Sequence, residues 1–155
     1  MHEETSDPSI DMQEEIERAR LIAFLFARHH EFRSVEDISL FGILTEVTVP
    51  LEETKRQMDL SVFIRVAGKF TESIYIHMHS PTQGMVEAIE LQLPNNISVE
   101  EDVPKYVETV WTIPFIFKEI GVYWFDVQYQ HGSLGKIPLL VRGEEKHNDN
   151  TSSPT

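Results

Sequence analysis

Apolar and polar residues alternate with a period of two along most of the chain after residue 59. This alternation is typical of β-strands that place one face against a core. Six stretches show it clearly: Leu60–Val66, Ile74–Met78, Ile89–Leu93, Val107–Phe117, Tyr123–Tyr129 and Ile137–Val141. We expect a strand at each of them.

Turn-forming residues separate these stretches. Ala67-Gly68-Lys69 predicts a hairpin turn between the first two strands, and His131-Gly132-Ser133 predicts one between the last two. Pro81 and Gly84 break the chain after the second strand. Pro114 cannot donate a ladder hydrogen bond, so its strand should lie at a sheet edge or contain a bulge.

Ile38–Val49 is also rich in strand-forming residues, with Gly42 as a point of close approach or a bulge. One face of this segment is expected to carry four apolar side chains: Phe41, Ile43, Val47 and Val49. Arg20–Phe32 leaves two interpretations open, because its run of apolar residues suits a helix by propensity and a buried strand by aromatic density. Ser34–Asp37 has the length of a hairpin loop, which favours the strand.

These segments make about eight strands without an alternation of strands and helices. They predict an all-β fold, an antiparallel immunoglobulin-like β-sandwich. Residues 1–19 form an acidic, partly flexible segment, in which Ser9 could cap a short helix through Ile16. Residues 20–142 form the sandwich domain, and residues 143–155 are polar enough to predict a disordered tail.

Two motifs carry a resemblance to a known family. The first is Ser39-Leu40-Phe41-Gly42-Ile43 with Val47-Thr48-Val49-Pro50, and the second is Gly121–Val127 followed by Gly132 and Ile137–Val141. Together with Leu60–Val66 they resemble a family of small bacterial β-sandwich proteins of unknown function. The resemblance covers roughly Arg20 to Val141 and implies a sandwich with no assigned activity. The acidic start of this chain departs from the family pattern.

Composition narrows the function further. The 155 residues include no cysteine, which excludes disulfides, thiol catalysis and cysteine-bound metals. The net charge of −13 repels polyanions, so we expect no nucleic-acid partner. The longest apolar run, Leu21–Ala27, is far shorter than the ~20 residues of a membrane helix. We expect no membrane partner, and the acidic N-terminus favours a cytoplasmic protein over a secreted one.

His77 and His79 are the candidate metal ligands, because residues two apart on a strand project from the same face. A third ligand for zinc or iron would have to come from His29, His30 or Glu31. The alternative is that both histidines simply face solvent. Acidic loops (Glu36-Asp37, Glu52-Glu53 with Asp59, and Glu100-Glu101-Asp102) could hold calcium, but they lack the expected spacing. We expect no cofactor.

Aromatic residues on the non-core faces of their strands are the candidate partner-binding residues: Trp124, Phe63 and Tyr75. Two explanations compete, a partner that covers these side chains or the N-terminal segment packing over them. A carbohydrate platform built on Trp111 or Trp124 is a further possibility. The sequence contains no nucleophile elbow, phosphate loop or zinc-protease motif. The leading hypothesis is therefore a non-catalytic protein-interaction module that binds a protein partner or itself, and a metal-dependent enzyme using His77 and His79 is the alternative.

Overall fold

The computed structural model describes residues 18–34, 37–93 and 106–145. These residues form nine strands and one short 3-10 turn, η1 (Glu53–Lys55). The strands are β1 (Arg20–Ser34), β2 (Asp37–Leu44), β3 (Glu46–Val49), β4 (Gln57–Ala67), β5 (Ile74–Ser80), β6 (Gly84–Leu91), β7 (Tyr106–Ile116), β8 (Gly121–Tyr129) and β9 (Gly132–Gly143).

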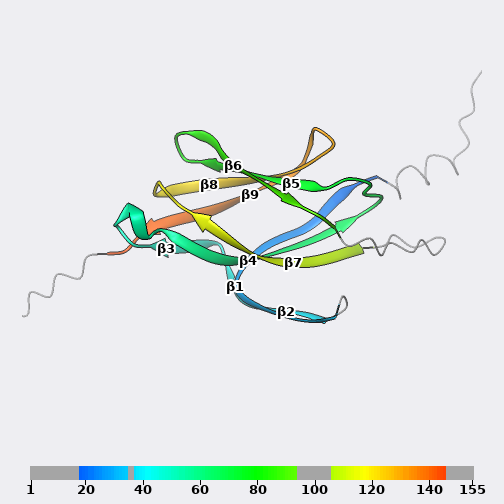
Figure 1. Cartoon of the computed structure of the whole chain (residues 1–155), viewed down its shortest axis with the longest axis horizontal. Coiled ribbons are helices and arrows are strands. Elements are labelled where there is room, and N and C mark those ends of the chain that lie inside the picture. The colour runs from blue at the N-terminus through cyan, green and yellow to red at the C-terminus, as the bar shows by residue number, and fades with distance from the viewer. Residues whose placement is uncertain (1–17, 35–36, 94–105, 146–155) are drawn as a thin grey trace, which may run out of the picture.

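The strands form two sheets that pack as two layers, so the predicted all-β sandwich is confirmed (Figure 1). Sheet A has the order β2-β1-β4-β7, and sheet B has the order β3-β9-β8-β5-β6. The predicted hairpin at Ala67-Gly68-Lys69 is wrong, because β4 and β5 belong to different sheets. Both strands present an apolar face to the same core, and the turn between them carries the chain from one layer to the other.

Three expectations about the first half of the domain can now be compared with the structure. Arg20–Phe32 is a strand, β1, as the hairpin length favoured. The single strand expected over Ile38–Val49 divides at Thr45 into β2 and β3, which lie in different sheets. The arrangement is also not wholly antiparallel, since β3 pairs with β9 in parallel.

The core is built on aromatic rings that meet between the sheets. Phe26 of sheet A packs edge-on against Phe125 of sheet B, with ring centroids 4.8 Å apart. Phe115 also contacts Phe125 in this way, at 5.5 Å. The hydroxyl of buried Tyr123 accepts a hydrogen bond from the backbone N–H of Glu119 at 2.9 Å. This tyrosine corner is a recurrent feature of immunoglobulin-like sandwiches and fixes the crossing from β7 to β8.

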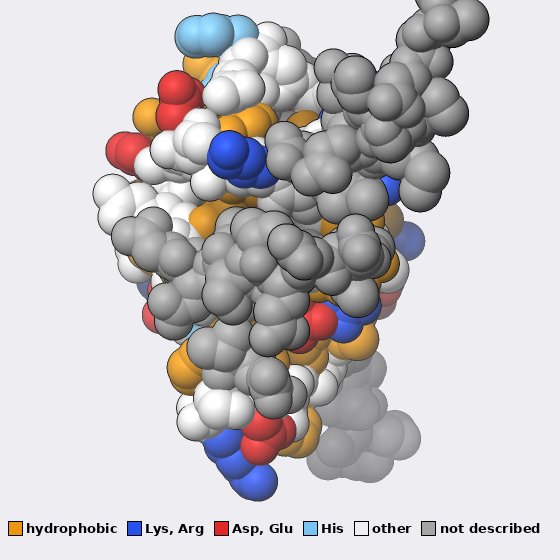
Figure 2. Space-filling model, turned by 90° about the vertical axis from the view of Figure 1, so that its right-hand side faces the viewer, with side chains coloured by type: hydrophobic (Ala, Val, Ile, Leu, Met, Phe, Trp, Pro, Cys, Tyr) orange, Lys and Arg blue, Asp and Glu red, His pale blue; other side chains and the backbone are white. Residues whose placement is uncertain are grey.

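Part of β1 and β2 leaves the sandwich as a two-stranded ribbon, here called the arm (residues 28–34 and 37–43). β1 pairs with β4 from Arg20 to Ala27 and beyond that point with β2. The arm lies on the side of sheet A away from sheet B (Figure 1). Figure 2 shows basic and acidic side chains together at the lower end of the molecule, where the arm lies.

The arm explains why one predicted core face is wrong. Val47 and Val49 are buried as expected, but Phe41 is 47% and Ile43 59% exposed. The alternation of the four residues is intact, but the segment that carries Phe41 and Ile43 has left the core. Near its base the arm is held to sheet A by His30, whose Nδ1 lies 2.7 Å from the hydroxyl oxygen of Ser61.

The remaining expectations concern edges and ends. β7 pairs with β4 on one side and with no other described strand, so Pro114 lies in an edge strand as predicted. The predicted helix from Ser9 to Ile16 lies outside the described residues, as does the tail from residue 146. Among the residues described, no helix has the length and apolar character needed to span a bilayer.

Candidate functional site

The outer face of sheet B carries four of the side chains that the sequence singled out. Its central strand is β8, with β5 on one side and β9 on the other. In the register, His79 lies beside Trp124 and His77 beside Asp126 on the β5 side. Pro138 and Lys136 are the corresponding neighbours on β9. This surface is called the Trp124 face, and its members are Tyr75, His77, His79, Val122, Trp124, Asp126, Gln128, Lys136, Pro138 and Leu140.

His77 and His79 share this face and are both half-buried. The three residues proposed to supply a third metal ligand lie on the arm, which extends sheet A. They are therefore on the opposite side of the sandwich from His77 and His79. Among the described residues, no three histidine, aspartate or glutamate side chains come close enough together to hold a metal ion. The structure does not bring the hypothetical metal site together.

Trp124 stands at the centre of an apolar cluster on the face. The indole is 45% exposed, and the neighbouring Val122 is 41% exposed. Pro138 pairs with Trp124 across the strands, and Leu140 pairs with Val122 in the same way. Cross-strand neighbours lie about 5 Å apart at their Cβ atoms, so these four side chains form one continuous surface. We call it the Trp124 cluster (Val122, Trp124, Pro138 and Leu140).

The other two aromatic candidates have different surroundings. Tyr75 is exposed on the Trp124 face, but it pairs with Gln128, two rows away from Trp124. Phe63 lies on the outer face of sheet A, between Leu25 and Val110 in the register. Its side chain is buried, because alternation places a side chain on a face without deciding whether that face is covered. Phe63 therefore offers little surface to a partner.

Sequence reasoning missed Asp126, a carboxylate that points outward and yet is only 5% exposed. Its Oδ2 accepts a hydrogen bond from Gln128 Nε2 at 2.6 Å, and its Oδ1 accepts one from the hydroxyl of Ser133. The bond from Ser133 joins β8 to the start of β9, and the two bonds together compensate the carboxylate for its lost water. The Asp-x-Gln spacing on one strand face was the available signal. Asp126 makes this part of the face polar and well ordered.

Two titratable groups lie where β7 turns into β8, beside the Trp124 cluster. The hydroxyl of Thr82 donates to Glu119, and this bond, with a further one from Ser80, lowers the pKa of that carboxyl below its usual value of 4.5. Burial raises the pKa of the Tyr123 hydroxyl above 10. Glu119 accepts hydrogen bonds from the Thr82 and Ser80 hydroxyls, and Tyr123 accepts one from the Glu119 backbone N–H, so both groups hold the turn in place.

The acidic loops show no calcium site in the part of the chain that is described. Glu52 pairs with Lys55 at 2.7 Å, which neutralises one of the proposed ligands. Asp59 lies on β4, away from η1. Glu36 and the group Glu100-Glu101-Asp102 lie outside the described residues.

Comparisons with known proteins do not show a family for this chain. No family model matches the chain, so membership of the family proposed from its motifs is not shown. No curated protein matches it either. A crystal structure of an immunoglobulin-like protein from Pseudomonas aeruginosa is similar over 81% of this chain and 97% of its own, with a TM-score of 0.43 and 17% identity. At that level the likeness carries no functional argument.

The Trp124 face combines two kinds of surface. An apolar cluster on a rigid strand lies beside a polar row of His77, Asp126 and Lys136. Interfaces between proteins combine an aromatic centre with a polar surround in this way.

Proposed function

We propose that this protein is a non-catalytic interaction module that binds another protein through the Trp124 face. The observation that carries the proposal is the half-exposed indole of Trp124, a member of the Trp124 cluster on the middle strand of a five-stranded sheet. Tryptophan is among the residues most enriched at binding hot spots. A strand inside a sheet also holds its side chains in place before binding, which lowers the entropic cost of association.

The charge of the chain favours a different protein over a second copy. Two copies would each bring a net charge of −13 and repel one another at long range. A neutral partner avoids this repulsion, and a basic partner would be attracted by the negative charge of the chain. The partner should therefore present an apolar recess for Trp124, surrounded by neutral or basic groups.

A carbohydrate is a less suitable occupant for this surface. Sugars need hydrogen-bonding groups around an aromatic platform. Among the immediate neighbours of Trp124, Val122 and Pro138 offer none, and the carboxylate of Asp126 is buried and already hydrogen-bonded within the protein. The second exposed aromatic side chain, Tyr75, is two rows away.

Removal of the indole provides the central test. A tryptophan side chain has an area of roughly 250 Å², and the 45% that is exposed leaves on the order of 100 Å² for a partner to cover. At about 25 cal/mol per Å² this area contributes about 2.5 kcal/mol, which is a factor of roughly 50 to 100 in Kd. Trp124→Ala should weaken binding by about that factor and leave the thermal stability nearly unchanged.

The experiment compares three immobilised proteins: wild type, Trp124→Ala, and Phe41→Ala as a control for another exposed aromatic on the arm. A protein captured from a lysate of the source cells supports the proposal if, once purified, it binds wild type and Phe41→Ala alike and Trp124→Ala at least tenfold more weakly. A partner that binds all three equally would refute the assignment of the face. Light scattering that shows a dimer disrupted by Trp124→Ala would assign the face to a second copy instead.

Two controls separate the alternatives. Retention on polysaccharide that Trp124→Ala abolishes would replace the proposal with a carbohydrate-binding function. Stoichiometric zinc or iron in purified protein, lost in His77→Ala, would establish the metal site.

A further inference from the structure

The departure of the arm leaves part of β4 without a neighbour on one side. β4 pairs with β7 along its whole length, from Gln57 to Ala67. On its other side β1 pairs with it from Ala67 to Ser61 and then turns away. No other described strand takes the place of β1 beside Gln57–Leu60. The N–H and C=O groups on this edge are available to an incoming strand.

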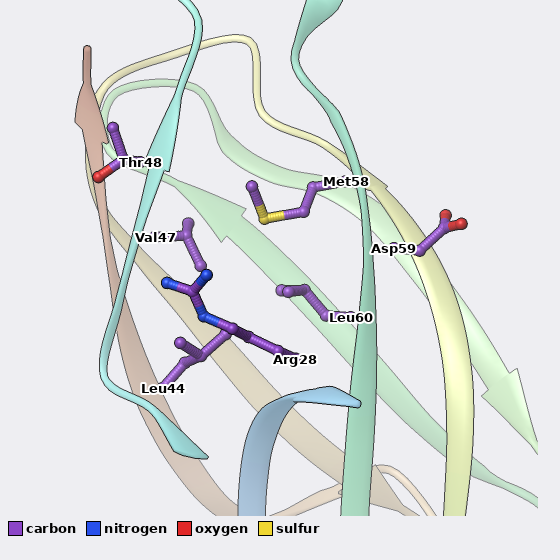
Figure 3. Close-up of a pocket in the computed structure, with 7 residues that line it drawn as sticks. All are labelled: Arg28, Leu44, Val47, Thr48, Met58, Asp59 and Leu60. Atoms are coloured by element: carbon purple, nitrogen blue, oxygen red, sulfur yellow. The ribbon is translucent and has the colours of Figure 1, made fainter. Parts of the chain in front are cut away.

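A pocket of about 370 Å³ opens beside this edge. One wall is β4, which contributes Met58 and Leu60, and the opposite wall is β3, which contributes Val47. Figure 3 shows these aliphatic side chains facing the same space. Leu60 and Val47 also belong to the buried core, so the floor of the pocket is apolar. The volume is sufficient for an aliphatic side chain.

Arg28, an exposed residue, brings a positive charge to this pocket. Its side chain extends from the base of the arm, and the guanidinium lies close to Val47 (Figure 3). Gly42 makes this path possible, because a Cβ at that position would lie 3.2 Å from Arg28 Cδ. Within the described part of the chain, no carboxylate forms an ion pair with Arg28. Asp59 also lines the pocket, but its carboxylate points away from the guanidinium.

We propose that this groove binds an extended acidic peptide segment of a partner protein by strand addition to Gln57–Leu60. The segment continues sheet A in the position that β1 leaves vacant. It inserts an aliphatic side chain between Met58 and Val47 and places a carboxylate against Arg28. Because residues two apart share a strand face, the two side chains stand two positions apart in the peptide. Backbone hydrogen bonds supply affinity and the two side chains supply specificity.

The guanidinium of Arg28, which pairs with no carboxylate among the described residues, is the reason for choosing an acidic occupant. A charge-assisted hydrogen bond to a carboxylate is about twice as strong as a neutral one. A second copy is a less favourable occupant because of the net charge of −13. An isolated acidic strand meets the same long-range repulsion but carries far fewer charges than a whole chain.

The probe is a blocked synthetic peptide of threonines in which one leucine and one aspartate stand two positions apart. Its twin carries asparagine in place of the aspartate. Binding is measured by calorimetry and by amide chemical shifts on wild type, Arg28→Gln, and the control Arg33→Gln at the tip of the arm. Wild type and Arg33→Gln should bind the aspartate peptide about tenfold or more tightly than its twin. Arg28→Gln should bind the two peptides equally, and the shifts should fall on Gln57–Leu60.

Several outcomes would overturn the proposal: no shifts with either peptide at millimolar concentration, equal affinities for the two peptides on wild type, or shifts confined to another surface. If Arg28→Gln does not fold, Arg28→Met removes the same charge and should also bind the two peptides equally. A dimer in light scattering that Arg28→Gln disrupts would assign the groove to a second copy. Trp124→Ala should bind the probe like wild type, so this test is independent of the Trp124 face.

Discussion

The most direct test of the packing concerns Arg56, a buried arginine that follows η1. Its side chain donates three hydrogen bonds to backbone carbonyls: Nε to Pro50 at 2.9 Å, Nη2 to Leu51 at 2.8 Å and Nη1 to Lys118 at 2.7 Å. The residue is 6% exposed. It therefore joins the segment after β3, the start of β4 and the segment after β7 through one guanidinium.

The expected loss on substitution follows from these contacts. A hydrogen bond that involves a charged group contributes about 1.5–3 kcal/mol net, and three bonds from one side chain are less than additive. Arg56→Met keeps the length of the side chain but leaves three carbonyls without this donor. When both partners of a buried ion pair are replaced by apolar side chains, no polar group is left without a partner. Here the three acceptors are backbone carbonyls, so they stay buried whatever side chain replaces Arg56. We expect the free energy of unfolding to fall by about 3–5 kcal/mol and Tm by roughly 10 °C.

Urea unfolding followed by circular dichroism measures this loss. Arg56→Lys should fall between wild type and Arg56→Met, because a lysine keeps the charge and cannot match the planar fork. Arg142→Met is the control, since exposed Arg142 makes a single ion pair with Glu46 at 2.9 Å and should lose less than about 1 kcal/mol. Equal losses in Arg56→Met and Arg142→Met would refute the reasoning. They would show that water replaces the guanidinium at the three carbonyls.

The two titratable groups of the β7–β8 turn give predictions of opposite pH dependence. Burial raises the pKa of Tyr123 in the folded state, so the unfolded chain ionises first and stability should fall as the pH rises above 10. Tyr123→Phe should flatten this alkaline loss and cost about 1 kcal/mol at neutral pH, where the Glu119 N–H loses its acceptor. The hydrogen bond from Thr82 lowers the folded pKa of Glu119, so its contribution is present above the unfolded pKa of 4.5 and disappears as the pH falls through the folded value. Glu119→Gln should reduce the loss of stability at acid pH. Urea unfolding midpoints measured across the pH range check both variants. A pH dependence of stability that is the same in the variant as in wild type would contradict the assignment for that residue.

The parts of the fold that the sequence predicts are those governed by alternation. Alternation places four residues of β8 on one face, and all four are buried: Tyr123, Phe125, Val127 and Tyr129. The edge position of β7 follows in the same local way from the missing N–H of Pro114. In both cases the signal lies within a few residues of the feature it predicts, so no knowledge of the tertiary structure is needed.

Features that depend on which strands become neighbours could not be predicted in this way. The alternation of Phe41 and Ile43 matches that of Val47 and Val49, but β2 and β3 belong to different sheets. Burial of Phe63 depends on its surroundings on the outer face of sheet A. The third ligand of the proposed metal site is a feature of the same kind, since the spacing of His77 and His79 is local and the position of a third ligand is not; among the described residues no such ligand lies nearby.

The groove beside β4 and the arm both arise because β1 stops pairing with β4 at Ala27. β1 has 15 residues and β4 has 11, so β1 is long enough to pair with the whole of β4. It turns away at Ala27 instead, which leaves the edge at Gln57–Leu60 open and carries Phe41 and Ile43 into solvent. Open strand edges and exposed apolar side chains promote aggregation, and natural sandwiches usually cover them. Continued pairing would have closed the edge with the residues already present. Among the described residues this edge has no partner strand, which supports the proposed strand addition, and Arg28 lines the same groove.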